Sequence, residues 1–480
     1  MVVIDKIQIK NIDQVYNRVI CEPGIQAELS DSLTFFAANY KFHPKFRARI
    51  WDGKIRLLHQ TGRFYHGLNY FIEEFAKDRG YEVEHLSDFS QEEFSLKEAE
   101  EFCKSLNLPL EVRDYQLKTF VRCVREKRAL VLSPTASGKS LIIYLLTQYY
   151  GGQCLIIVPQ IGLVTQMAGD FKDYGYKHPI QEIYGGQDKK LNEMICISTW
   201  QSLYKNPKKF FDDFDLIIVD EAHQAKAVSI TKIMENTPNC EHKFGFTGTI
   251  DDSLTNKLTL EGLFGKIIHL TTTEKLQKEG HLAQLKIKCV ELKYADEYRK
   301  LNYRAKYEDE VAWLLSHQPR NEFIKNLVLS LKGNTLLLFR FVDKHGVPLY
   351  NIIQKEAKIP VYYVAGAVPA DDREQIRKVV DTHEDSITVA SMGVFSQGIN
   401  IIHINNIVLA TPIKSKIRIL QSIGRGLRKS EKKKTCTLID VADDLIWKNR
   451  DNHTISHYKE RVSLYAKEMF QYKIYKVKIK

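Results

Sequence analysis

Short apolar runs separated by segments with helical spacing dominate the chain from residue 128 onward. The first series of runs comprises residues 128–132, 154–158, 195–199, 215–220 and 243–247. The second series comprises residues 334–339, 361–364, 387–391, 406–410 and 436–440. Apolar strands that alternate with helices are typical of a parallel sheet covered on both faces. The pattern therefore predicts two successive α/β domains, each built on a parallel sheet.

The start of the chain follows a different pattern. Residues 1–10 alternate apolar and polar side chains as a strand does, and residues 46–59 indicate a hairpin that turns at Asp52-Gly53. Residues 68–80 have the spacing of an amphipathic helix, and the acidic stretch 82–101 has the character of a connector. The sequence therefore predicts a small α+β domain in front of the two parallel-sheet domains.

The end of the chain predicts a helix over residues 454–470, followed by the segment 472–480, which is too basic and too regularly alternating for a core strand. The expected boundaries are an N-terminal basic domain at 1–100, two α/β domains at 101–280 and 281–450, and a C-terminal helix with a basic tail at 451–480.

Composition narrows the class of protein. The chain is 44% hydrophobic and 11% aromatic, as in folded globular proteins, and its formal charge of +11 with a pI of about 9.0 favours a polyanionic partner. Its eight cysteines are scattered without a CxxC pair, which argues against zinc and disulfides and favours a reducing cytoplasm, that of the host if the protein is viral. The N-terminus lacks the pattern of a signal peptide, and apolar runs stay far short of the ~20 residues needed to span a bilayer, so we expect no membrane association.

A phosphate-binding turn is indicated where the first strand ends. The turn Pro134, Thr135, Ala136 and Ser137 leads into Gly138, Lys139 and Ser140, and a segment with helical spacing follows. Ser133 stands where the usual pattern has its first glycine, but small residues still let backbone N–H groups converge on phosphate oxygens. Lys139 can reach the β- and γ-phosphates of ATP, and Ser140 can ligate Mg²⁺. An ordinary strand–turn–helix junction would show the same local pattern.

Two carboxylates end another apolar strand. In DLIIVDEAHQA (215–225), Asp220 and Glu221 follow four apolar residues, at the edge where parallel sheets bind their ligands. Asp220 can hold the Mg²⁺ that Ser140 also holds, and Glu221 can orient and deprotonate the attacking water. A solvated strand end is the alternative.

Two arginines close the second series. In QSIGRGLR (421–428), Arg425 and Arg428 are three residues apart and share a face on a helix. Two guanidinium forks on one face suit the γ-phosphate of ATP, although a solvated basic turn remains the alternative. Because the phosphate turn and the arginines belong to different domains, we expect ATP to bind between the two domains.

The segment 40–67 is rich in basic residues and has interleaved aromatic residues. In the predicted hairpin, Arg47 and Arg49 share one strand face beside Trp51, and Lys54 and Arg56 share a face across the turn. Basic side chains with aromatic rings between them are suited to contacts with nucleic-acid phosphates and bases. A structural domain with a charged outer face stays possible.

Seven motifs in order resemble those of superfamily 2 helicases. Asp220 to His223 forms a DEAH box, and the other six are Arg113 with Tyr115-Gln116, VPQIGLVTQ (158–166), STWQSL (198–203), Thr247-Gly248-Thr249, SQGINI (396–401) and QSIGRGLR (421–428). The resemblance implies two tandem RecA-like motor domains that hydrolyse ATP with Mg²⁺. It also implies adenine recognition by Arg113 and Gln116, nucleotide contact at Gly398, and a catalytic role for Gln421 with Arg425 and Arg428. Nucleic-acid contact is implied at Gln166, Thr199 and Gln201, and coupling through His223, Thr247 and Thr249.

The N-terminal pattern FxPxFRxxxWDGxIRLL and the C-terminal YAKEMFQY (465–472) resemble the UvsW-like phage DNA helicases, so the likeness extends over nearly the whole chain. It implies an ATP-dependent helicase or translocase that remodels branched DNA, by fork regression, Holliday-junction branch migration and R-loop unwinding, in recombination, repair and replication. The implied partners are branched duplex and single-stranded DNA, an RNA–DNA hybrid, and recombination or single-strand-binding proteins.

Three other functions remain open. An RNA helicase can carry a DEAH box, although such families normally have a long C-terminal extension. A translocase subunit of a restriction-type complex would need a nuclease or a partner. A nucleic-acid clamp with an inactive ATPase is disfavoured by the presence of Lys139, Glu221, Arg425 and Arg428.

Overall fold

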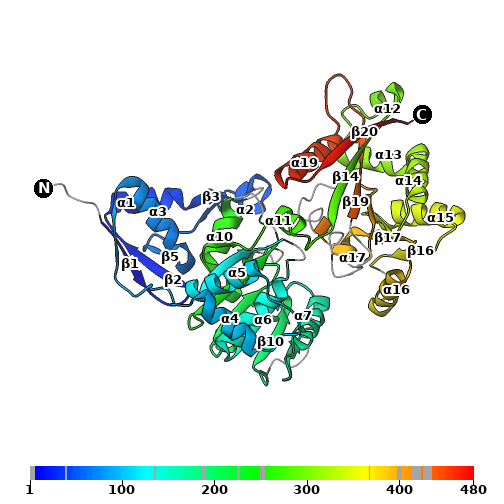
Figure 1. Cartoon of the computed structure of the whole chain (residues 1–480). Coiled ribbons are helices and arrows are strands. Elements are labelled where there is room, and N and C mark those ends of the chain that lie inside the picture. The colour runs from blue at the N-terminus through cyan, green and yellow to red at the C-terminus, as the bar shows by residue number, and fades with distance from the viewer. Residues whose placement is uncertain are drawn as a thin grey trace. The chain divides into compact units, whose positions relative to one another are not determined.

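The computed structural model of the 480-residue chain describes residues 6–37, 40–134, 137–185, 190–223, 227–248, 250, 254–366, 368–396, 403–412, 423–424 and 435–479. The chain forms two compact units (Figure 1). Apart from residues 135–137, the first unit runs to Thr271 and the second begins at Thr272.

The first unit begins with a small α+β domain. Its sheet has the order β5-β2-β1-β6, in which β1 pairs antiparallel with β2 and parallel with β6. The strands are β1 (Lys6–Asn11), β2 (Tyr16–Ile20), β5 (Arg63–Tyr65) and β6 (Glu82–His85). The helices are α1 (Pro23–Ser32), η2 (His66–Leu68) and α3 (Asn69–Arg79). Alternation in β1 buries Ile7 and Ile9 against the apolar faces of α1 and α3, which closes the core of this domain.

The predicted hairpin over 46–59 is wrong. His43 accepts a hydrogen bond from the backbone N–H of Lys45, and Pro44 occupies the first helical turn, so the chain forms the short helix α2 (Pro44–Arg47) instead of a strand. Only β4 (Lys54–Arg56) is extended, and it pairs antiparallel with β3 (Thr34–Phe36), which precedes η1 (Tyr40–Phe42). Arg47 and Arg49 therefore lie on a helix and its following turn, not on a strand face.

The interpretation of residues 82–101 as a connector is also wrong in part. Residues 82–85 are β6, which completes the N-terminal sheet beside β1. The helix α4 (Leu96–Ser105) then begins with a capping box in which Ser95 and Glu98 satisfy each other's backbone N–H groups. Acidic residues on the outer face of these elements gave the stretch its connector-like composition.

The rest of the first unit is a parallel sheet with helices. In the described residues its order is β13-β7-β12-β11-β8-β10-β9, and every pairing is parallel. The strands are β7 (Arg128–Leu132), β8 (Cys154–Val158), β9 (Gln181–Ile183), β10 (Ile195–Thr199), β11 (Leu216–Val219), β12 (His242–Thr247) and β13 (Ile267–His269). The helices are α5 (Asp114–Glu126), α6 (Lys139–Tyr150), α7 (Ile161–Asp173), α8 (Trp200–Leu203), η3 (Lys208–Phe211), α9 (Ala227–Glu235) and α10 (Leu254–Phe264). The central strands are buried along their length because helices lie on both faces.

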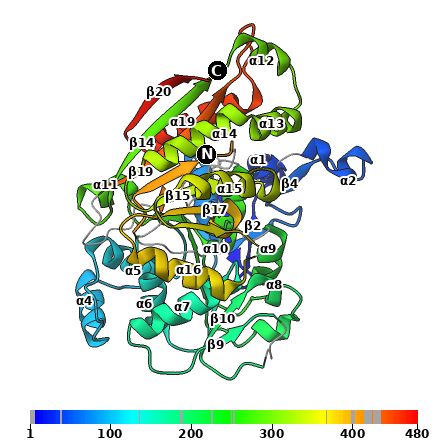
Figure 2. The same cartoon turned by 90° about the vertical axis from the view of Figure 1, so that its right-hand side faces the viewer.

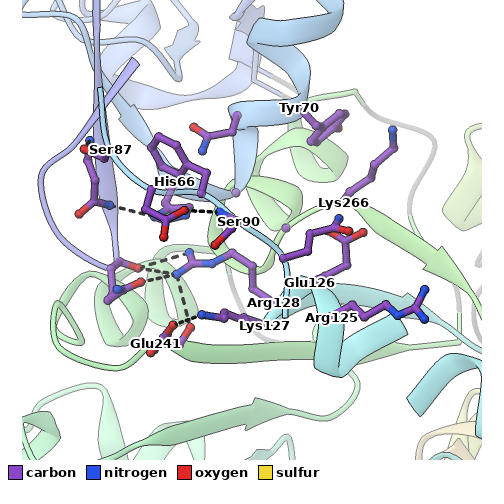
Figure 3. Close-up of a pocket in the computed structure, with 18 of the residues that line it drawn as sticks. His66, Tyr70, Ser87, Ser90, Arg125, Glu126, Lys127, Arg128, Glu241 and Lys266 are labelled. Atoms are coloured by element: carbon purple, nitrogen blue, oxygen red, sulfur yellow. Dashed lines mark hydrogen bonds and ion pairs between the residues drawn. The ribbon is translucent and has the colours of Figure 1, made fainter. Parts of the chain in front are cut away.

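The N-terminal domain packs on this sheet through a polar seam. Tyr16 and Tyr65 both donate to Glu235 Oε1 at 2.8 Å, and Lys243 Nζ donates to the backbone carbonyl of Gln14 at 2.8 Å. The backbone at Gly67 approaches α10 so closely that a side chain there would collide with carbonyl oxygens. A cavity of about 610 Å³ lies in the seam, and residues from both the N-terminal domain and the parallel-sheet domain line it (Figure 3).

The second unit contains another parallel sheet, in the order β16-β17-β15-β18-β19-β14-β20 over the described residues. The strands are β14 (Gln284–Lys293), β15 (Thr335–Phe339), β16 (Val361–Val364), β17 (Ile387–Ser391), β18 (Asn406–Leu409), β19 (Thr435–Asp444) and β20 (Tyr472–Lys478). The helices are α11 (Thr273–Lys278), α12 (Asp296–Leu301), α13 (Tyr307–Ser316), α14 (Gln318–Ser330), η4 (Val342–Gly346), α15 (Val347–Glu356), α16 (Ala370–Thr382), α17 (Met392–Ser396) and α19 (His453–Lys467).

The C-terminal segment contributes an edge strand to this sheet. β20 pairs in parallel with β14, which in turn pairs with β19 (Figure 2). Its exposed, lysine-rich character agrees with the edge of a sheet and not with its core. Beneath the sheet, Arg461 of α19 forms a buried ion pair with Asp440 at 2.8 Å, and Tyr465 donates to the same carboxylate.

The predicted fold class is confirmed: two parallel-sheet domains follow a small α+β domain. The exact domain boundaries proposed from the sequence stay predictions. Within the part of the chain that the structure describes, no helix is long and apolar enough to cross a membrane.

Candidate functional site

The phosphate turn lies at the carboxyl end of β7, where α6 begins. Gly138 is the residue before the helix and has a φ of +81°, a left-handed conformation that glycine adopts without strain. Among the described residues no side chain caps α6, so the N–H groups of its first turn point to a place where an anion can bind. Pro134 and Ser137 flank the turn, while the structure does not describe Thr135 and Ala136.

Lys139 is the cation of this site. Its Nζ lies 2.5 Å from Glu221 Oε1 and 3.6 Å from Asp220 Oδ1. Burial lowers the pKa of the Lys139 ammonium, but Glu221 and Asp220 outweigh that effect, and the pKa is raised above its usual value. The lysine is therefore fully charged at neutral pH and is held by two carboxylates that phosphate oxygens can replace.

The two carboxylates follow β11 directly. Asp220 Oδ1 accepts a hydrogen bond from the Glu221 backbone N–H at 2.9 Å, and Glu221 has a φ of +49°, which turns the chain sharply out of the strand. Burial and the neighbouring Glu221 raise the pKa of the Asp220 carboxyl against the lowering effect of Lys139. A buried and a half-buried carboxylate side by side with one lysine are an arrangement that an additional cation would stabilise, which fits the expected Mg²⁺.

Ser140, the other expected Mg²⁺ ligand, begins α6 beside Lys139. Its Oγ lies 2.8 Å from the hydroxyl of Tyr174, which follows α7. Tyr174 was not predicted, because 34 residues separate it from Ser140 and no local pattern connects the two. The hydroxyl contact sets the position of Ser140 before any ligand binds.

A hydrogen bond connects the DEAH box to the neighbouring strand. His223 Nδ1 lies 2.6 Å from Thr247 Oγ1, at the end of β12, and 3.4 Å from Glu221 Oε2. Burial lowers the pKa of His223 more than Glu221 raises it, so the ring is neutral at pH 7. The contact joins two of the three residues expected to couple nucleic acid to ATP; the third, Thr249, lies outside the described residues.

Of the two residues expected to bind adenine, Gln116 contacts the phosphate turn directly and Arg113 is joined to it through Gln116. Gln116 is buried on α5, its Oε1 accepts from the Arg113 backbone N–H at 3.0 Å, and its Nε2 donates to the Gly138 carbonyl at 3.5 Å. The Arg113 guanidinium donates to the Tyr115 hydroxyl at 2.7 Å. Gln116 is thus adjacent to the proposed phosphate site, and Arg113 lies next to Gln116.

Three residues expected to bind nucleic acid follow β8 and β10, at the same edge of the sheet. Thr199 ends β10 with its Oγ1 3.1 Å from Ser202 Oγ, and Gln201 donates to the Pro159 carbonyl at 3.1 Å. Gln166 is exposed on α7. In the sheet order, the ATP-site residues lie at or directly after β7, β12 and β11. Thr199 ends the more distant strand β10, Gln201 lies on α8 after it, and Gln166 lies on α7 after β8.

Four further predicted residues cannot be placed. Gly398, Gln421, Arg425 and Arg428 all lie outside the described residues, so their assigned roles stay predictions.

The basic N-terminal residues are brought together around α2, in a different arrangement from the predicted hairpin. Arg47 ends α2 over the ring of Phe42 at 5.9 Å, and Arg49 lies in the following turn. Trp51 Nε1 donates to the Lys54 carbonyl at 2.9 Å. Arg56 forms an ion pair with Asp52 and lowers the pKa of that carboxyl to about 2, so its charge is already balanced.

A phosphate turn with its lysine and a DEAH box, on one of two tandem parallel-sheet domains, defines the chain as a helicase of superfamily 2. Three family models match it: DNA helicase UvsW, N-terminal, over residues 6–85; type III restriction enzyme, res subunit, over residues 109–252; and helicase conserved C-terminal domain over residues 319–430.

The ATP-dependent DNA helicase uvsW of Enterobacteria phage T4 is 35% identical over 95% of this chain and 96% of the relative. The crystal structure of T4 UvsW matches with a TM-score of 0.53 and 33% identity, and covers 98% of this chain and 99% of that chain. The DNA 3'-5' translocase XPB2 of Sulfurisphaera tokodaii is 26% identical over 67% of this chain and 80% of the relative. The chain belongs to the UvsW family of DNA helicases, which confirms the resemblance seen in the sequence.

Proposed function

We propose that this protein is an ATP-dependent DNA helicase that remodels branched DNA, through fork regression, Holliday-junction branch migration and R-loop unwinding. The observation that carries the proposal is the cluster of Lys139, Asp220 and Glu221 at the edge of a parallel sheet, in a chain that also has the UvsW N-terminal domain. The proposed substrates are ATP, single-stranded DNA and branched duplexes, with RNA–DNA hybrids included.

We propose that ATP hydrolysis depends on an exchange of the anions that contact Lys139. Incoming phosphate oxygens replace the carboxylates on Lys139, which keeps its charge throughout. Once released, Glu221 accepts a proton from the attacking water, a contribution worth roughly 10²–10⁴ in rate. Ser140 and Asp220 are the residues that would hold Mg²⁺, which supplies neutralisation of phosphate charge. From the second motor domain, Arg425 and Arg428 are proposed to stabilise charge on the γ-phosphate.

Coupling to DNA is proposed to run through the DEAH box. Removal of the Glu221–Lys139 contact changes the charge beside His223, whose ring touches Thr247. Gln166, Thr199 and Gln201 are proposed to hold the strand that moves. The basic N-terminal domain is proposed to hold the duplex arms of the branched substrate.

The test compares ATP hydrolysis with strand displacement on matched substrates. Full-length protein is mixed with a fork, a four-way junction, an R-loop and an RNA duplex of the same sequence, with Glu221→Gln as the inactive control. We expect DNA-stimulated hydrolysis and displacement on the branched DNA substrates. Preference for the RNA duplex would indicate an RNA helicase. Translocation without strand displacement would indicate a translocase subunit, and binding without ATP hydrolysis would indicate a clamp. Each of these outcomes would overturn the proposal.

A further inference from the structure

The segment from β3 to β4 forms a small module that exposes apolar side chains. Ile50 is 76% exposed and Phe42 is 70% exposed, although both are large hydrophobic residues. The exposed basic residues Lys41, Lys45, Arg47 and Arg49 lie close to them in the sequence. An exposed apolar surface among basic residues marks a site that binds something both apolar and anionic.

A hollow of about 530 Å³ lies beside α2 within this module. Its aromatic lining consists of Phe46 and Trp51, both half-buried and both fixed in place: the Phe46 ring packs edge-on against Tyr40 at 4.9 Å, and Trp51 donates to the Lys54 carbonyl. Small-ligand sites typically occupy about 300–1,000 Å³ and have mostly apolar linings. The hollow is therefore large enough for one nucleotide unit, with flat rings available to a base.

Basic side chains surround this aromatic lining. Lys41, Arg47 and Arg49 also line the hollow, together with Ile50 and one acid, Asp52. The Asp52 carboxylate is already paired with Arg56, so its charge does not oppose an incoming anion. The lining is thus net positive around an apolar centre, which complements a base flanked by phosphates.

Arg49 occupies a backbone position that favours glycine. Its φ is +56°, and the hydrogen bonds from the Arg49 N–H to the Phe46 carbonyl and from the Ile50 N–H to the Lys45 carbonyl form a Schellman motif after α2. An arginine in this left-handed conformation is strained, and strain of this kind collects at functional sites. The strained turn at Arg49 places Ile50 in the lining of the hollow.

We propose that the hollow lined by Phe46, Trp51 and Ile50 captures one unpaired base of a DNA strand at the branch point, while Lys41, Arg47 and Arg49 hold its flanking phosphates. The inference rests on the proposed function, and it names the part of the branched substrate that this module recognises. The base stacks on the fixed rings of Phe46 and Trp51. While the base is held in the hollow it cannot pair with the opposite strand, so the separated strands do not anneal again at the branch point.

The test measures binding of the full chain to two forks that differ at one position. Both forks have a single unpaired nucleotide at the branch, which carries a base in one fork and is abasic in the other. We expect the wild type to bind the fork with the base about tenfold more tightly, because stacking of one base on an aromatic ring has that effect. Equal binding of the two forks by the wild type would overturn the inference without any variant.

Variants locate the effect in the hollow. Phe46→Leu keeps an apolar side chain but removes the ring, and it should abolish the preference for the base. Phe42→Leu removes a ring outside the hollow and should retain the preference; loss in both variants, or in neither, contradicts the assignment. Arg49→Gly relieves the strained φ, so it should fold, bind both forks more weakly and lower the slope of log affinity against log salt by about one unit.

Hydrolysis of ATP with single-stranded DNA, measured on the same preparations, separates this inference from the proposed function. If hydrolysis is absent in the wild type, the helicase assignment fails whatever the forks show. If hydrolysis is normal and no base preference is found, only the base-capture site fails.

Discussion

Two lysines lie at opposite ends of the strands of the first parallel sheet, and they have opposite electrostatic environments. Lys139 follows β7 at the carboxyl edge and is paired with two carboxylates. Lys243 lies near the start of β12 at the amino edge, where its Nζ donates to the carbonyls of Gln14 at 2.8 Å and Thr237 at 2.9 Å. Burial lowers the pKa of both ammonium groups, but only at Lys139 do neighbouring anions reverse the effect.

At Lys243, burial and the neighbouring Arg128 lower the pKa to about 7. Neutral carbonyls hold this lysine, and one of them belongs to the N-terminal domain, so the contact joins two domains permanently. The carboxylates on Lys139 can be exchanged for phosphates, because an anion replaces an anion. The difference between the two edges is therefore a difference between a structural contact and a ligand site.

The largest expected effect comes from removal of the exchangeable lysine. Lys139→Ala should reduce ATP hydrolysis below detection in a phosphate-release assay, because neither phosphate binding nor charge stabilisation survives. Lys243→Met serves as the matched control and should hydrolyse ATP at close to the wild-type rate. Turnover by Lys139→Ala within about tenfold of wild type would contradict the phosphate-site assignment.

Glu221→Gln should reduce kcat by about 10²–10⁴ while ATP still binds, since only the group that takes the proton from water is lost. Equilibrium binding of a fluorescent ATP analogue tests whether nucleotide binding is retained, and steady-state hydrolysis measures the reduction in kcat. Loss of nucleotide binding with a changed Mg²⁺ dependence would instead give Glu221 the role assigned to Asp220.

The lowered pKa of Lys243 predicts that the stability of the folded chain depends on pH. Its pKa is about 7 in the folded chain against 10.5 for an ordinary lysine, so between these values the unfolded chain binds more protons and stability rises with pH. Lys243→Met should remove this component, which is at most about 1.4 kcal/mol per pH unit. Calorimetric unfolding of both proteins at pH 7 and pH 9 measures it, and an identical pH dependence in the two proteins would show that Lys243 does not titrate there.

The smallest effect is expected at the hydroxyls of the seam. Tyr16→Phe and Tyr65→Phe each remove one hydrogen bond to Glu235 and should destabilise the domain contact by about 1 kcal/mol. Hydrogen exchange of the β1 and β2 amides reports this loss, with Tyr350→Phe in the second unit as the control. No change in exchange would mean that the seam is held by its other contacts, such as that of Lys243 with Gln14, without these hydroxyls.

Buried parallel strands were predictable because they require continuous apolar runs. The bounds predicted for the strands at 128–132, 154–158 and 195–199 agree with β7, β8 and β10. β14 was missed because alternating lysines give it the pattern of a surface segment. The module around α2 was misread because the cap at His43 and Pro44, and not apolar spacing, determines its conformation.

Site residues that belong to short motifs were predictable for a related reason. Lys139, Asp220 and Glu221 each end or follow an apolar strand, and strand ends meet at one edge of a parallel sheet. Tyr174 beside Ser140, and Gln14 beside Lys243, are contacts between residues far apart in sequence. No local pattern encodes such pairs, so only the folded chain reveals them.

The position of β14 has a consequence for synthesis of the chain. Residues 284–293 of β14 pair on one side with residues 435–444 and on the other with residues 472–478. At about 5–20 residues per second, a ribosome makes β14 roughly seven to thirty seconds before its first neighbour. The strands of the first unit are all complete by His269, so that unit can fold while β14 still waits with both edges unpaired. During this interval the nascent chain exposes an apolar strand, which a chaperone would protect from aggregation, whereas slow translation past residue 293 would prolong the exposure.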